Sequence, residues 1–183
     1  NDMAPVVVWI KRRDTTGAGQ LHHTQATNVD SFLPVDGGTD GEEDPGVESF
    51  SAFGSDGFTV VSHNGSNNAS GTYVAWSWAG GTTSGITTNA ATDITPSGYS
   101  FNQTSGFSLF KFTGNATDDQ QVAHGIGKVV HFVITKVSSS SGDNWVVFHH
   151  KLHATDPGDK YLRLNTAGTT SDAATRWSDA EPD

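Results

Sequence analysis

The sequence contains no cysteine among its 183 residues. This absence excludes disulfide frameworks, thiolate zinc sites and thiol chemistry. Charged residues are also scarce, at 16%, and most polar positions hold Gly, Ser, Thr, Asn or Asp, which favour short strands and turns over long helices. A chain of this length can bury a core without cross-links, so composition indicates a turn-rich β protein.

Basic residues and long apolar runs are lacking too. Ten Lys and Arg stand against 20 Asp and Glu, for a formal net charge of -10. Nucleic-acid surfaces need clustered Lys and Arg, so we expect no nucleic-acid partner. The longest apolar run, Val6–Ile10, is far shorter than the roughly 20 residues that span a bilayer, so we expect no membrane insertion.

Runs of β-branched and aromatic residues, bounded by Gly, Asn, Asp and Ser, predict the strands. They cover residues 5–12, 18–23, 57–62, 72–78, 106–113, 120–123, 129–137, 144–149 and 160–164. This spacing is typical of an all-β, antiparallel β-sandwich. In the run 72–78, Val74, Trp76 and Trp78 share one face, and we expect that apolar face to lie in the core.

An internal repeat indicates the domain organisation. The segment VVVWIK at Val6 matches HFVITK at His131, an offset of 125 residues, and each leads into a strand that ends in paired histidines. We predict a first β unit at 1–80 with an acidic loop at 34–48, a Gly/Thr/Asn-rich linker or arm at 81–99, and a partial second unit at 100–183. The two units pack separately or as one sandwich.

The second unit lacks counterparts of the strands at 57–62 and 72–78 that close the first. A partial unit leaves unpaired strand edges, which the chain itself or a partner must cover. We therefore expect the partner surface in residues 100–183.

An ordered succession of blocks carries a family resemblance. The blocks are VWIKRRD (8–14), FGSDGFTV (53–60), GTYVAWSW (71–78), GFSLFKFTGN (106–115), HGIGK (124–128), FVITK (132–136) and DNWVVFH (143–149). Their order resembles a module family of tail-fibre and other virion structural proteins of marine bacteriophages. The resemblance implies a concanavalin-like jelly-roll sandwich, a location on the virion surface and a non-enzymatic role, usually host attachment.

The leading hypothesis is therefore a phage virion structural protein, a tail-fibre or host-attachment module that assembles as a homo-oligomer, for which a trimer is plausible. Its partners would be copies of itself, other virion proteins and a host surface glycan. One alternative is a decoration protein of the capsid shell, and another is a lectin-like carbohydrate-binding module. An enzyme is not expected, because the sequence shows neither a G-x-S-x-G motif nor a spaced carboxylate pair of the E-x-D kind.

Two sets of residues are candidates for metal binding. The paired histidines of the repeat, His22, His23, His149 and His150, would form a site only if they converged across paired strands or around a symmetry axis, because neighbours on a strand point to opposite faces. The acidic loop offers Asp36, Asp40 and Glu42 to Ca²⁺. The alternatives are polar packing for the histidines and a solvated loop for the acids, so no cofactor is required.

Three residues are candidates for contact with a partner or glycan. Trp177 lies in a polar tail, whereas the other tryptophans lie in strand patterns where core packing is expected. Tyr99 and Arg12 complete the set. Flat aromatic rings suit the apolar face of a pyranose, so these positions would serve a glycan or a protein surface.

Overall fold

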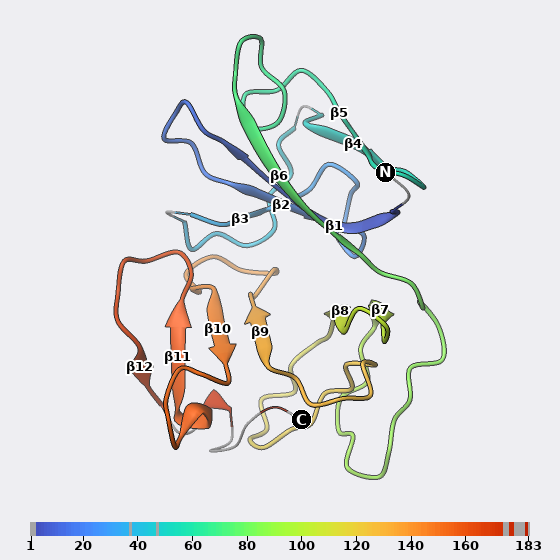
Figure 1. The fold of residues 1–183 in the computed structure, drawn as a ribbon, viewed down its shortest axis with the longest axis vertical. Helices are drawn as coiled ribbons and strands as arrows, with labels where there is room; N and C mark the ends of the chain where they lie inside the picture. Colours follow the sequence, from blue (N-terminus) through green and yellow to red (C-terminus); the bar gives the residue numbers. More distant parts are fainter. Residues whose placement is uncertain (1–2, 37, 47, 174–175, 178–181, 183) are drawn as a thin grey trace. The chain divides into compact units, whose positions relative to one another are not determined.

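The computed structural model of the chain describes residues 3–36, 38–46, 48–173, 176–177 and 182. Its regular elements are strands, together with one 3₁₀ turn, and all strand pairs in these residues are antiparallel (Figure 1). The predicted all-β, antiparallel fold class is confirmed. The described residues include no helix long and apolar enough to cross a membrane.

The chain divides into two compact units, each described here by itself. The first comprises residues 1–81 and 137–143, and the second comprises residues 82–136 and 144–183. The returning segment 137–143 is tied to the acidic loop by backbone hydrogen bonds. Glu42 N–H donates to the Ser138 carbonyl at 2.8 Å, and Gly142 N–H donates to the Thr39 carbonyl at 3.1 Å.

The first unit has two layers. One is a four-stranded sheet in the order β3-β2-β1-β6 and the other is the β4–β5 hairpin. Val8 and Ile10 of β1 pack against Phe50 of the hairpin, and all three are nearly or fully buried. This arrangement is compatible with the predicted sandwich, while the jelly-roll connectivity stays a prediction. The strands are β1 (Pro5–Arg12), β2 (Gln20–His23), β3 (Leu33–Pro34), β4 (Phe50–Phe53), β5 (Phe58–Val60) and β6 (Tyr73–Ala79).

The expectation that the tryptophan face of β6 lies in the core is wrong. Trp76 and Trp78 are 46% and 36% exposed, whereas Tyr73, on the opposite face, packs against the core cluster. The reason is the register with β1, which places Ala75 beside the buried Ile10. On this face of β6 the core cluster contacts Tyr73, while Ala75 is itself exposed.

The second unit has a four-stranded sheet in the order β12-β11-β10-β9 and a separate β7–β8 hairpin. Phe148 is fully buried, and Trp145, Val147 and Tyr161 are nearly so. The elements are β7 (Gly98–Asn102), β8 (Phe107–Lys111), β9 (Phe132–Thr135), β10 (Val146–His149), η1 (Pro157–Asp159), β11 (Lys160–Arg163) and β12 (Ser171–Asp172). The strand predicted at 120–123 is reduced to one bridge, Ile94↔Val122.

The predicted repeat is present as a three-stranded meander with one register. In the first unit Val8 lies opposite His22, and in the second Val133 lies opposite Phe148. All four residue pairs of β1–β2 have counterparts in β9–β10. The duplication therefore preserves strand pairing, although the paired histidines are shifted by one residue, so that Phe148 and His149 lie at the positions of His22 and His23.

The third strand and the flanking bonds repeat as well. Leu21↔Leu33 in the first unit matches Val147↔Leu162 in the second. Thr24 N–H donates to the Val6 carbonyl at 3.0 Å, and His150 N–H donates to the His131 carbonyl at the same distance.

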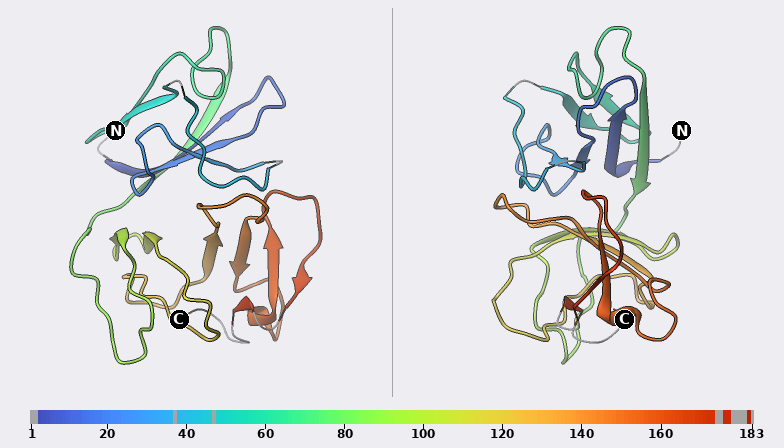
Figure 2. Two further views of the ribbon diagram at one scale, coloured as in Figure 1. Left: turned by 180° about the vertical axis from the view of Figure 1, so that it is seen from behind. Right: turned by 90° about the vertical axis from the view of Figure 1, so that its left-hand side faces the viewer.

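The two meanders differ at one edge. In the first unit β6, the long green strand in Figure 2, pairs along β1 from Pro5 to Arg12. In the second unit, over the described residues, β9 pairs with β10 alone. The closing strand of the first meander thus has no counterpart on the second in this part of the chain.

Candidate functional site

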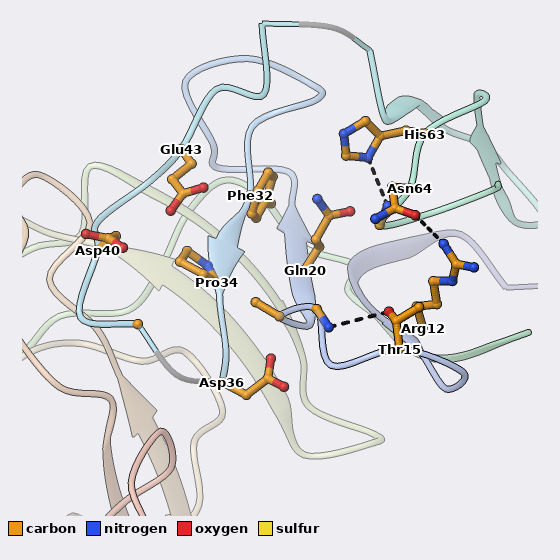
Figure 3. Close-up of a pocket in the computed structure, with 14 residues that line it drawn as sticks. Arg12, Thr15, Gln20, Phe32, Pro34, Asp36, Asp40, Glu43, His63 and Asn64 are labelled. Atoms are coloured by element: carbon orange, nitrogen blue, oxygen red, sulfur yellow. Dashed lines mark hydrogen bonds between the residues drawn. The ribbon is translucent and has the colours of Figure 1, made fainter. Parts of the chain in front are cut away.

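A hollow of about 490 Å³, lined mainly by polar residues, lies in the first unit. Gln20 of β2 forms its middle, with Arg12 and Asn64 on one side and Asp40 and Glu43 on the other (Figure 3). The strands fix these positions because Gln20 pairs with both Ile10 and Pro34. The hollow thus joins β1 and β2 to the acidic loop and to the turn at 63–65.

Two carboxylates of the hollow have shifted pKa values. Burial would raise the pKa of Asp36, but hydrogen bonds from the Lys11 ammonium (2.5 Å) and the Gly19 N–H outweigh it and lower that pKa. The pKa of Glu43 is raised, first by burial and then by the negative charge of Asp40. The carboxyl groups of Asp40 and Glu43 thus lie close enough to interact on one side of the hollow.

Arg12, a predicted contact residue, is held within the first unit. Its guanidinium donates to both carboxylate oxygens of Asp14, at 2.7 and 3.1 Å, and to the Asn64 side chain. The hydrogen bond to Asp14 is the main cause that raises the pKa of Arg12. Its charge thus orders the rim of the hollow.

The three acidic candidates for Ca²⁺ have different surroundings. Asp36 is bound by Lys11 and Gly19, and Glu42 accepts a hydrogen bond from the Thr27 N–H at 2.7 Å. Asp40 lies beside Glu43 in the hollow. Within the described ranges, no group of three His, Asp or Glu side chains could hold a metal ion, and Ca²⁺ binding stays a prediction.

The paired histidines do not converge across paired strands. His22 and His23 lie on β2, which pairs with β1 and β3, whereas His149 lies on β10, which pairs with β9 and β11. Convergence across paired strands is therefore wrong, while convergence around a symmetry axis stays a prediction. Within the second unit, the His150 ring stacks on His131 at 4.3 Å and lies 4.9 Å from His149.

His22 is a core residue. Its ring is fully buried and stacks on Phe50 at 4.5 Å. Nδ1 lies 3.2 Å from the Ser31 carbonyl, which assigns the proton to that nitrogen, and Nε2 is buried with no hydrogen-bond partner. Burial, followed by the charges of His23 and His63, lowers its pKa from 6.5 to about 4. His22 is therefore neutral at physiological pH.

The remaining contact candidates pack inside the second unit. The Trp177 ring meets Phe148 edge-on at 5.6 Å, and its Nε1 donates to the Lys160 carbonyl at 3.1 Å. Tyr99 accepts a hydrogen bond from the Ile86 N–H through its hydroxyl at 3.0 Å and stacks on Phe101. Both rings are partly buried, so they contribute to the packing of this unit.

The exposed tryptophans, which sequence reasoning assigned to the core, lie on the first unit. Trp76 and Trp78 are alternate residues of β6 and therefore share a face. Trp9 of β1 lies opposite Trp76 with ring centroids 5.2 Å apart. Trp76 is thus an exposed ring with a partner that orients it.

Comparison with protein-family models matches residues 1–183 to the family described as "Domain of unknown function (DUF7483)". The chain belongs to the DUF7483 family. Comparisons with curated proteins and with solved structures found no match. The case for what this DUF7483 chain does therefore depends on its own residues.

Proposed function

We propose that the chain is a non-enzymatic structural module of a phage virion, part of a tail fibre or host-attachment apparatus, that assembles with copies of itself. The order of the sequence blocks supports the phage assignment, because it resembles that of virion modules. In the alternative, a capsid-decoration protein, the same module assembles with its neighbours on the shell instead of on the tail.

The repeated meander is the observation that carries this proposal. The two meanders have the same register, because the pair Val8↔His22 in the first is equivalent to Val133↔Phe148 in the second. The first meander is closed by β6, whereas in the described residues β9 has no paired strand on its other side. A duplicated unit with an open edge suits modular assembly, in which the missing contact comes from a neighbour.

Purified particles test the virion role. We expect peptides of the chain in the proteome of density-purified phage, and gold-labelled antibodies at one fixed location on every particle. Label on the fibres supports attachment, and label over the shell supports decoration. Purified particles that lack the chain would contradict both forms of the proposal.

A lectin-like role is the second candidate, and the exposure of Trp76 and Trp78 favours it. Alternate residues on a strand are about 6.8 Å apart, so the two rings can contact neighbouring parts of one saccharide by stacking. The Lys11–Asp36 ion pair follows on the same face of β1, two residues from Trp9, and offers charged hydrogen-bonding groups to hydroxyls.

A glycan array distinguishes a lectin-like role from a purely structural role in assembly. We expect wild-type binding to a restricted set of glycans and its loss in Trp76→Ala/Trp78→Ala. Phe112→Ala removes another exposed ring, 40% accessible, and should bind as wild type does. Binding that survives in the double variant would exclude the tryptophan face.

A further inference from the structure

The open side of β9 is an edge that this fold closes elsewhere. Its repeat equivalent β1 has β2 on one side and β6 on the other, both antiparallel. Over the residues described, β9 has β10 on one side and no paired strand on the other. The first meander thus shows that this edge accepts an antiparallel strand.

The backbone groups that face the open side can be assigned. The hydrogen bond from His150 N–H to the His131 carbonyl shows that His131 faces β10. The N–H and C=O groups of successive residues in a strand point to opposite sides. The backbone groups of Val133, two residues after His131, therefore also point toward β10. Phe132 and Ile134 therefore present their N–H and C=O groups to the open side.

The first unit confirms this alternation. Val6 accepts from the Thr24 N–H on the β2 side, whereas the Arg13 N–H donates to Thr72 on the β6 side. Odd-numbered β1 residues therefore bond toward β6. Their repeat equivalents in β9 include Phe132 and Ile134.

The side chains on this edge are apolar and exposed. Phe132 is 53% exposed and Ile134 is 37% exposed, and they share one face of the strand. The strand FVIT has no charged residue and no proline, the usual features that keep an edge strand from pairing. Nothing in β9 itself therefore opposes pairing with another strand.

We propose that β9 pairs antiparallel with β9 of a second copy, about a two-fold axis at Val133. Phe132 then lies opposite the partner's Ile134, and each donates a backbone hydrogen bond to the other. These are the residues whose backbone groups face outward, so the register satisfies both copies. The same patch serves both subunits, and the contact closes as a dimer.

The alternative of pairing with β6 of a second copy fits less well. On β6 the backbone groups toward β1 belong to the even-numbered residues, so the outer edge presents Ala75 and Ser77. Their small side chains would lie opposite Phe132 and Ile134. Self-pairing instead places the large apolar side chains opposite each other, as Trp9 and Trp76 lie in the first unit.

A cysteine at the axis tests the register, because the chain has no cysteine of its own. Val133 would face the partner's Val133 in a non-hydrogen-bonded pair, where Cα atoms are about 4.5 Å apart and a disulfide can form. We expect Val133→Cys to give a covalent dimer under mild oxidation, several-fold faster than Thr135→Cys. Equal yields, or no dimer in either variant, would overturn the pairing.

Charge substitutions test the same contact without cross-linking. Ile134→Lys should weaken dimerisation by roughly tenfold in sedimentation equilibrium, since it removes both apolar cross-strand pairs. Adding Phe132→Glu should restore it, because each Glu then faces a Lys of the other copy. Leu164→Lys, an exposed position of the same unit, should dimerise as wild type does.

This inference deepens the proposed assembly role and rests on it. A wild-type chain that stays monomeric at millimolar concentration, or dimers indifferent to Ile134→Lys, would overturn β9 pairing. Detection of the chain on phage particles would still support the virion role in that case. Dimers with the predicted register and no chain on particles would support the pairing and contradict the virion role.

Discussion

Lowering the pH should destabilise the first unit through His22. The folded protein holds this ring neutral, with Nε2 buried and unpartnered and with a pKa of about 4 against 6.5 for the unperturbed group. The unfolded chain therefore binds a proton more readily than the folded chain. Stability is full above pH 6.5 and is lost as the pH falls toward 4.

The size of the effect follows from the pKa difference. A difference of one in pKa corresponds to about 1.4 kcal/mol of folding free energy. The full loss of stability is therefore about 3 kcal/mol, of which about 2 kcal/mol is lost by pH 5. This is a large part of the roughly 5–15 kcal/mol that stabilises most proteins. Asp36, whose pKa is lowered, loses its contribution only below its usual range, whereas Glu43, whose pKa is raised, gains stability as the pH falls. The His22 contribution is therefore measured as the difference between two proteins that share both carboxylates.

The repeat provides the matched substitution. Phe148 occupies the position equivalent to His22 and is also fully buried, so His22→Phe replaces the titrating ring with one that the same meander already accommodates. It gives up the hydrogen bond to the Ser31 carbonyl and removes the unpartnered Nε2. We expect the variant to be close to wild type at pH 7 and more stable than wild type at pH 5.

Urea unfolding followed by circular dichroism at pH 7, 6 and 5 measures both proteins. The wild-type free energy of unfolding should fall by about 2 kcal/mol more than that of His22→Phe across this range. Phe112→Ala, a change at an exposed ring that carries no titratable group, should keep the wild-type pH dependence. Equal pH dependence in wild type and His22→Phe would refute the reasoning.

Two further substitutions test the acidic loop. Gly41→Ala would place its methyl group 2.6 Å from the Ser138 carbonyl oxygen and should lower the free energy of unfolding in urea by about 1–3 kcal/mol. As the control, the methyl group of Gly57→Ala meets nothing within 4 Å, so this variant should change stability by less than about 0.5 kcal/mol. Asp36→Asn weakens the bonds from Lys11 and Gly19 and should lower stability by about 1 kcal/mol, seen as a lower Tm; an unchanged Tm would mean that the ion pair contributes nothing.

The fold class and the repeat could be predicted because they depend on local pattern. Strands such as β1 and β9 are runs of β-branched and aromatic residues bounded by turns, and their similarity needs no long-range information. The short strands β3 and β12 are two residues each, too short to show a period. Their formation depends on the neighbouring strand that pairs with them.

The exposed face of β6 could not be predicted for a different reason. Alternation separated Trp76 from Ala75 correctly, but it does not show which face the β4–β5 hairpin covers. That choice depends on Phe50 packing on Val8 and Ile10, which are distant in sequence. Likewise, Trp177 is in a polar tail yet packs on Phe148, a tertiary contact without a sequence signal.

Amide hydrogen exchange along β9 is the most direct test of the open, self-pairing edge. In dilute solution, Val133 and Thr135 should be protected by β10 while Phe132 and Ile134 exchange freely, and at high concentration the latter two should become protected as well. The account would be contradicted if the Phe132 and Ile134 amides were protected at every concentration, or if they stayed unprotected at high concentration.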